Sequence, residues 1–213
     1  MPSSSHLLAF AVAAFILIQI PGPSLLFTIG RALSVGRRDA LLSVLGNSAG
    51  VFVQVAAVAT GVGAVVATSA QVYTVLKLAG AAYLIWLGVT AIRSRRDLTT
   101  ALLDGRGRAL PTWKVLRTGF TVGVTNPKTI VFFAALLPQF IDADRGMPAL
   151  QMVVLGAIFC AIAIVSDGAW ALVAGRARDW FASSLHRLER IGGTGGVMMI
   201  GLGAALAVSG RPE

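Results

Sequence analysis

The sequence predicts an all-α integral membrane protein: six transmembrane helices forming two inverted three-helix repeats, with the first and fourth spans broken at proline. Three observations support this fold class. Of the 213 residues, 56% are hydrophobic and only 13% are charged, with a mean hydropathy of +0.79, whereas a soluble domain carries about 25% charged residues. The apolar residues fall into six long runs, and prolines interrupt two of these at matching positions. We expect one transmembrane domain over residues 1–213, with repeat halves of approximately 1–98 and 112–213.

Each of the six apolar segments is long enough to cross the hydrocarbon core of a bilayer, which takes roughly 20 mostly apolar residues. The short link Ala67–Ala70 separates the second segment from the third, because one merged run would be far too long for a single helix. The predicted spans are Ser5–Ile29, Leu41–Val66, Gln71–Ile92, Thr118–Ile141, Leu150–Ala174 and Ile191–Val208.

Most basic residues fall in three of the predicted loops, those after the first, third and fifth spans. Lysine and arginine crowd the cytoplasmic loops of membrane proteins, so we expect these loops in the cytoplasm and both termini on the outer side. This bias also accounts for the net charge of +9 without nucleic acid as a partner. The residues are Arg31, Arg37, Arg38, Arg93, Arg95, Arg96, Arg106, Arg108, Lys114, Arg117, Arg176, Arg178, Arg187 and Arg190.

The first span is interrupted by the stretch QIPGPSLLF, Gln19–Phe27. A proline in a helix interior removes a backbone donor and clashes with the preceding turn, at a cost of about 3 kcal/mol. Pro21, Gly22 and Pro23 therefore predict that one helix ends here and another begins, with Ser24 in its first turn. A helix that starts inside the membrane presents unpaired N–H groups and a positive dipole end, which suit a carboxylate.

The fourth span contains a second break, VTNPKTIVFF, Val124–Phe133. Asn126 is a favoured N-cap and Pro127 suits the first helical position, so a new half-helix is expected there. Pro127 follows Pro23 by about half the chain length. Either proline alone fits a simple kink, but matched breaks in inverted halves are typical of a transporter's central binding site. Because the breaks also free carbonyls for an ammonium group, one zwitterion could use both.

Three ionisable side chains fall within predicted spans, where such groups are costly and by default functional. Lys128 follows the second break, where its charge would attract a substrate carboxylate. Asp167 is the acid placed well inside a span and is the expected proton-coupling residue. Lys77, in the third span, either serves the site or extends its ammonium to the membrane interface.

Small and polar residues share one face of the second predicted span, with spacings of three, four and seven. Glycines let helices approach closely, and amide side chains bond across helices. We expect Gly46 and Gly50 to serve packing, and Asn47 and Gln54 to line the pathway as well. The small-residue run Ile191–Leu206 in the last span is a further packing surface and a candidate homodimer contact.

Three stretches resemble the LysE/RhtB family of bacterial amino-acid exporters, and the resemblance covers nearly the whole chain. It implies a six-span protein of the bacterial cytoplasmic (inner) membrane that exports amino acids or close derivatives by proton antiport. We expect no enzymatic activity, because no Ser–His or Asp–Asp pair falls within the predicted spans, and no cofactor. A neutral, homoserine- or threonine-like substrate is favoured over a basic one. The stretches are PGPSLLFTIGRALSVGRRDALLSVLGNSAGV from Pro21, LKLAGAAYLIWLGVTAIRSRR from Leu76 and GVTNPKTIVFFAALLPQF from Gly123.

The breaks and the polar residues within the spans define the expected site. We expect proton exchange at Asp167 and no metal site. Substrate contacts are expected from Pro21, Gly22, Pro23, Ser24, Asn47, Gln54, Asn126, Pro127 and Lys128.

Two other functions stay open. A metal or inorganic-cation exporter could use the same scaffold, although soft metals favour thiolate, thioether or imidazole ligands. The chain has a single cysteine, Cys160, and both histidines, His6 and His186, lie outside the predicted core. A non-transporting membrane scaffold is the other alternative, and binding of amino acids to the purified protein would distinguish it from a transporter.

Overall fold

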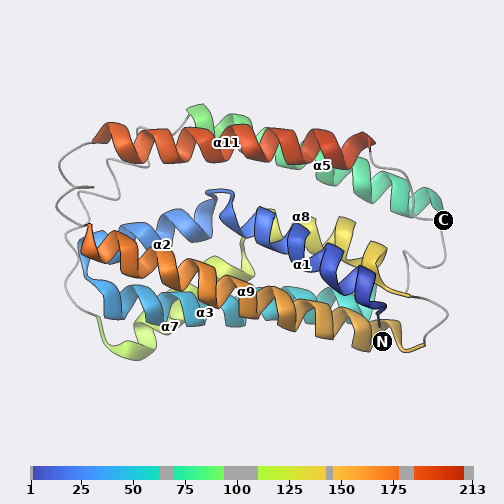
Figure 1. Ribbon diagram of the computed structural model, residues 1–213, viewed down its shortest axis with the longest axis horizontal. Coiled ribbons are helices and arrows are strands. Elements are labelled where there is room, and N and C mark those ends of the chain that lie inside the picture. Colours follow the sequence, from blue (N-terminus) through green and yellow to red (C-terminus); the bar gives the residue numbers. More distant parts are fainter. Residues whose placement is uncertain (1, 63–69, 94–109, 143–145, 178–184, 209–213) are drawn as a thin grey trace.

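The computed structural model describes residues 2–62, 70–93, 110–142, 146–177 and 185–208. All regular secondary structure within these ranges is helical (Figure 1). The elements are α1 (Ser4–Gln19), α2 (Pro23–Ser34), α3 (Arg37–Ala57), the π-helix η1 (Val58–Val62), α5 (Ala70–Arg93), α7 (Thr112–Val124), α8 (Pro127–Leu136), the 3-10 helix η2 (Leu137–Phe140), α9 (Pro148–Arg176) and α11 (Leu185–Val208).

Two pairs of consecutive helices are bent at a short break. The axis turns by 52° between α1 and α2, and by 47° between α7 and the helical stretch Pro127–Phe140. A proline occupies the first turn of both α2 and α8, where its missing N–H leaves no helical hydrogen bond unmade. Each break therefore places the end of one helix beside the start of the next.

Two unbroken helices in the described ranges are long and apolar enough to cross a membrane. They are Arg37–Gly61, which joins α3 to most of η1, and α9. Counting each bent pair as one span raises the number of candidate spans to four within these ranges.

Several basic residues that the sequence assigned to loops lie in helices instead. Arg31 is in the last turn of α2, and Arg37 opens α3, so the predicted first loop shrinks to the turn Val35–Gly36. Gly36 has a φ of 127°, a conformation that glycine adopts without steric cost. Arginine and lysine are good helix formers, so helices continue past the ends of the apolar segments.

Helices also extend into the predicted third and fifth loops. Lys114 and Arg117 lie in α7 and Arg176 ends α9, whereas Arg187 and Arg190 lie in α11. Arg38 lies in α3 and Arg93 ends α5. Most of the link Ala67–Ala70 falls outside the described residues, and so do the other basic residues of the predicted loops, Arg95, Arg96, Arg106, Arg108 and Arg178.

Glycines bring α3 and α7 into backbone contact. A β-carbon at Gly46 or Gly50 would collide with the α7 backbone, and one at Gly119 or Gly123 would collide with the α3 backbone. The two helices run side by side in the same direction, and this close approach is typical of helix packing in membranes. This close approach places the polar residues of α3 beside the C-terminal end of α7.

A layer formed by α5 and α11 lies alongside the other helices (Figure 1). Gly196 and Gly203 of α11 face the backbone of α5, with Gly88 opposite Gly196. This part of the small-residue run Ile191–Leu206 therefore packs against α5 of the same chain. The pair contacts the rest of the described structure mainly where α5 packs on α8.

The largest core cluster lies between α1, α3, α8 and α9. Its aromatic centre joins Phe10 of α1, Phe132 and Phe133 of α8 and Phe159 of α9, all fully or almost fully buried. The ring centroids of Phe133 and Phe159 are 4.9 Å apart in an edge-on arrangement, which aromatic pairs favour. This cluster fixes α8 against α9 next to the second break.

Candidate functional site

The two helix breaks meet in the interior of the protein. The side-chain amide of Asn126, before α8, donates to the hydroxyl of Ser24, in the first turn of α2, at 2.7 Å. That hydroxyl donates in turn to Oδ1 of Asn47 in α3 at 2.8 Å. All three side chains are buried, so a continuous polar chain ties together three helices.

The starts of α2 and α8 are capped differently. Asn126 is the N-cap of α8, and its Oδ1 accepts the backbone N–H of Lys128 at 3.1 Å. The N-cap of α2 is Gly22, which has no side chain to cap it. The first turn of α2 therefore has backbone donors free of side-chain caps, with the positive end of the helix dipole behind them.

The side chain of Lys128 reaches across to the end of α1. Its Nζ donates to the carbonyl oxygens of Leu17 at 3.0 Å and Ile20 at 2.8 Å. Lys128 is 4% exposed, and its positive charge meets the negative end of the α1 dipole. A β-carbon at Gly22 would lie 3.2 Å from this Nζ, so the glycine makes room for the ammonium group.

A matching contact closes the end of α7. Nε2 of Gln54, in α3, donates to the carbonyl oxygens of Gly123 at 2.8 Å and Val124 at 3.0 Å. The last carbonyls of a helix have no partners within it, and Gln54 supplies one. Lys128, which follows the second break, thus binds the end of α1, the helix before the first break. Gln54, which lies between the two breaks in the sequence, binds the end of α7, the helix before the second break.

A small cavity of about 20 Å³ lies where these contacts converge. That volume is enough for about one water molecule, so this conformation encloses the site without room for a larger ligand. Its apolar lining includes Phe159 and Ala163, and its polar lining is formed by Ser24, Asn47, Asn126, Lys128, Thr129 and Asp167.

Asp167 brings a carboxyl group to this cavity from α9. It is 5% exposed, and among the described residues no side chain forms an ion pair or a hydrogen bond with it. A buried carboxylate without a partner is costly. The cavity therefore combines a carboxyl group that has no hydrogen bond or ion pair among the described residues with an ammonium group that is bound to the carbonyls of Leu17 and Ile20.

The expected site residues fall into two groups. Ser24, Asn47, Asn126, Lys128 and Asp167 line the cavity. The others border it: Pro21, Gly22, Pro23 and Pro127 form the breaks, and Gln54 binds the end of α7. The side chain of Lys77 lies outside the part of α5 whose side chains are described.

Some groups at the cavity were not predicted from the sequence. Thr129 lines it and donates to the carbonyl of Asn126 at 3.0 Å. Its position one residue after Lys128, in the same helical turn, was the available signal. The carbonyls of Leu17 and Ile20 carry no side-chain signature, and only their place just before the break could have indicated them.

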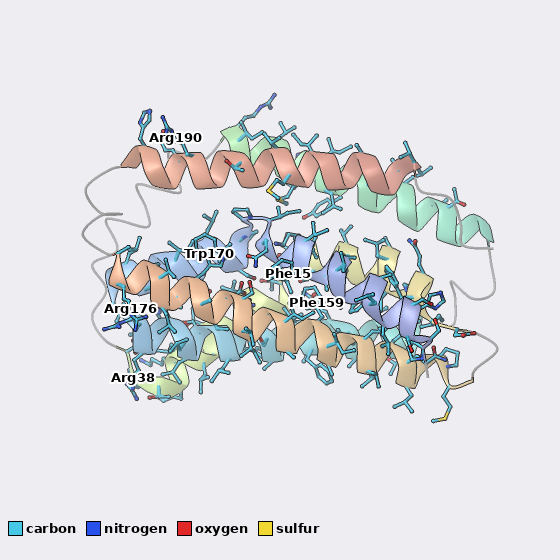
Figure 2. The ribbon with its side chains drawn as sticks, in the orientation of Figure 1. Phe15, Arg38, Phe159, Trp170, Arg176 and Arg190 are labelled. Carbon is cyan, nitrogen blue, oxygen red and sulfur yellow. The ribbon has the colours of Figure 1, made fainter. Side chains whose placement is uncertain are left out.

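A much larger groove, of about 680 Å³, lies between α1 and α9. Phe15 of α1 and Trp170 of α9, both labelled in Figure 2, line it, and Nε1 of Trp170 donates to Oε1 of Gln19 at 3.1 Å. The groove is almost entirely apolar, so it lacks the convergent polar groups that orient a charged ligand. The small polar cavity is therefore the better candidate site.

Comparison with known proteins points to transport. The family model described as LysE type translocator matches residues 15–210. The chain is 36% identical over 203 residues to an "Uncharacterized membrane protein" of Vibrio cholerae, which covers 95% of this chain and 96% of the relative.

Two further relatives carry functional names. A "Homoserine/homoserine lactone efflux protein" of Salmonella typhimurium is 31% identical over 202 residues, covering 93% of this chain and 94% of the relative. A "Leucine efflux protein" of Klebsiella pneumoniae is 26% identical over 204 residues, covering 94% and 93%. No solved structure matches the chain.

Proposed function

The chain belongs to the family of LysE type translocators, and from this premise we propose that it exports a neutral amino acid or a close derivative as a secondary transporter. Family membership makes it a membrane transport protein rather than an enzyme. The observation that carries the substrate class is the cavity at the two breaks. It lies between the start of α2 and the end of α1, two helix ends of opposite polarity, which suit the two charges of an amino acid.

The two ends of the substrate bind different groups in this proposal. Its carboxylate accepts from the first-turn N–H groups of α2, beside Ser24. Its ammonium group donates to the carbonyls of Leu17 and Ile20. Asn47 and Asn126 contact the polar part of the substrate, since both line the cavity. Among the described residues, Asp167 is the one carboxylate that could bind a second cationic group in the cavity, so a neutral substrate side chain is favoured over a basic one.

The remaining expected residues hold these groups in place. Pro21, Gly22 and Pro23 set the geometry of the first break, and Pro127 sets that of the second. Gln54 holds the end of α7. Lys128 supplies the positive charge of the site.

The proposed topology has six spans in the bacterial cytoplasmic membrane, with both termini outside and two inverted halves of three spans each. The bent pairs begin the two halves, and α3 and α9 follow them in the chain. Helices α5 and α11 have 24 residues each. At 1.5 Å per residue such helices extend about 36 Å, longer than a hydrocarbon core of about 30 Å. A second copy would contact Gly201 of α11, beside which nothing lies within 4 Å.

Export against a gradient requires an energy source, and we assign this role to proton antiport through Asp167. It is buried and lines the cavity, and an ionisable group at that depth is functional by default. A proton bound there would enter as the substrate leaves.

An efflux panel tests the proposed function. Cells with and without the gene are loaded with single amino acids, among them homoserine, threonine, leucine and lysine, and release is measured over time. We expect gene-dependent release of a neutral amino acid and none of lysine. Metal-tolerance assays on the same strains test the cation exporter, and a protein that releases nothing and binds no amino acid when purified is better described as a scaffold.

A further inference from the structure

The ammonium group of Lys128 occupies the carbonyl pair that the proposed function assigns to the substrate. Its Nζ lies 3.0 Å from the Leu17 oxygen and 2.8 Å from the Ile20 oxygen. An α-ammonium group has the same charge and the same three donors as a lysine ammonium. Because the cavity measures about 20 Å³ and like charges repel, the two groups cannot share this place. Lys128 must leave before a substrate ammonium can bind there.

Asp167 offers Lys128 another partner. Both residues line the same cavity, and the carboxyl group of Asp167 has no partner among the described residues. An ionised, buried carboxylate attracts a nearby ammonium group, whereas a protonated carboxyl group does so far less. The protonation state of Asp167 therefore decides which of the two partners Lys128 favours.

Among the residues that the structure describes, no other ionisable side chain lines the cavity. Cys160 of α9 donates to the carbonyl of Ser48 instead. The side chain of Lys77, in α5, is outside the described part of the structure. The other ionisable side chains of the elements packed around the cavity do not line it, and these are His6, Arg31, Arg37, Arg38, Asp39, Tyr83, Arg93, Lys114, Arg117 and Arg176.

We propose that Lys128 is an internal competitor for the substrate's ammonium group, and that it moves between the Leu17 and Ile20 carbonyls and the carboxylate of Asp167. This inference rests on the proposed function. When Asp167 is protonated, Lys128 stays on the carbonyls and blocks the site. When Asp167 releases its proton to water on the cytoplasmic side, Lys128 pairs with it and the substrate binds to the freed carbonyls.

The charge balance of this exchange is simple. Lys128 stays an ammonium group throughout, and only Asp167 gains or loses a proton. On the outer side, the substrate leaves, Asp167 takes up a proton, and Lys128 returns to the carbonyls. The proton and the substrate therefore never occupy the site together. That exclusion is what an antiporter needs in order to avoid moving both in the same direction.

A double-mutant binding experiment tests the exchange. Purified protein in lipid nanodiscs is titrated with L-homoserine and with L-leucine. Asp167→Asn mimics the protonated state and keeps Lys128 on the carbonyls, so we expect binding at least about tenfold weaker, the equivalent of losing one hydrogen bond to a charged group. Adding Lys128→Met to Asp167→Asn removes the competitor, and binding should return to within about threefold of wild type.

The matched control is Lys114→Met, which removes the same charge from an exposed position on α7. It should leave binding unchanged in both the wild-type and the Asp167→Asn protein. Across a pH series, wild-type binding should weaken as the pH falls, whereas binding to Lys128→Met should stay constant. An Asp167→Asn protein that binds like wild type, or a double mutant as weak as Asp167→Asn alone, overturns the inference.

A second variant covers the case in which Lys128→Met does not reach the membrane. Lys128→Gln replaces the buried ammonium group with a neutral amide that keeps donors but carries no charge. It should compete with the substrate ammonium far less than lysine does, so Lys128→Gln in Asp167→Asn should recover binding. A folded double mutant without any recovery contradicts the exchange. A wild-type protein that binds neither amino acid and shows no efflux contradicts the proposed function instead.

Discussion

The side-chain amide of Asn126 donates a 2.7 Å hydrogen bond to the hydroxyl of Ser24, so the first turns of two half-helices from opposite parts of the chain are joined directly. Asn126 also caps α8 through its Oδ1. Asn126 therefore stabilises the start of α8 and links it to the start of α2.

Asn126→Ala removes both of these contacts. Loss of an N-cap costs about 1 kcal/mol, and loss of a buried hydrogen bond costs about another 1 kcal/mol. We expect a lower unfolding temperature in detergent and weaker export. Ser3→Ala is the control, because Ser3 caps α1 far from the cavity. It should cost a similar cap energy and leave substrate affinity unchanged, and equal loss of affinity in both variants would argue against a site role for Asn126.

Gln54→Ala should destabilise the second break. It leaves the last carbonyls of α7 without their buried donor, at a cost of about 1–3 kcal/mol. Gln54→Glu should be worse at neutral pH, because it turns an acceptor toward carbonyl oxygens. Thermal unfolding of purified protein measures both. Gln139→Ala, which loses a bond to the carbonyl of Ala135 in its own segment, serves as the comparison and should have the smaller effect.

Gly50→Ala and Gly123→Ala should each disrupt the contact between α3 and α7. A β-carbon at either position meets the backbone of the facing helix, which cannot yield as a side chain does. Overpacking of this kind costs about 1–3 kcal/mol, and we expect less folded protein in the membrane fraction. Gly201→Ala points into open space and should be neutral or slightly stabilising. If all three variants accumulate equally, the close approach of α3 and α7 is not needed.

Asp167→Asn should abolish uphill export in proteoliposomes that carry a proton gradient. The amide can neither release a proton nor draw Lys128 away from the carbonyls, so accumulation should fall to the level of empty liposomes. Glu189→Gln, in α11 and outside the cavity, removes an acid of the same charge and should retain accumulation. Gradient-driven export by Asp167→Asn at normal protein levels would assign energy coupling to other groups.

The orientation of the chain can be read by cysteine labelling. In a Cys160→Ala background, Ser4→Cys at the start of α1 and Leu110→Cys just before α7 introduce single exposed thiols. A membrane-impermeant maleimide added to intact cells should label Ser4→Cys and leave Leu110→Cys unlabelled until the membrane is permeabilised. The reverse pattern would place both termini in the cytoplasm.

The helix starts were accessible from the sequence because proline and its neighbours act locally. A proline fixes φ and cannot donate, so Pro23 and Pro127 indicated helix starts without any tertiary information, and α2 and α8 begin at these residues. Helix ends were harder to predict. Arg31 and Arg37 were assigned to a loop from their charge, although arginine continues a helix readily.

The contacts of the site were only partly accessible. The cavity collects Asn47 and Asp167 from different helices, and helical periodicity placed both on inward faces. The role of Lys128 was not predictable in the same way. From the sequence, its charge is expected to attract a substrate carboxylate, but in the structure its ammonium group binds two carbonyls more than 100 residues earlier in the chain. Which partner a lysine chooses depends on tertiary contacts that no local pattern encodes.

The hydrogen bonds that Lys128 makes across the breaks also have a consequence for how the protein is made. When α1 and α2 leave the ribosome, the carbonyl of Ile20 lacks its donor and the carbonyl of Leu17 keeps only the backbone N–H of Ile20, because the lysine that binds both is residue 128 of 213. In a bilayer such unpaired groups are expensive. We therefore expect the first segment to stay in contact with the translocon or an insertase until the fourth has been synthesised. We expect quality-control proteases that recognise membrane segments with unpaired polar groups to degrade a chain that is truncated before Lys128.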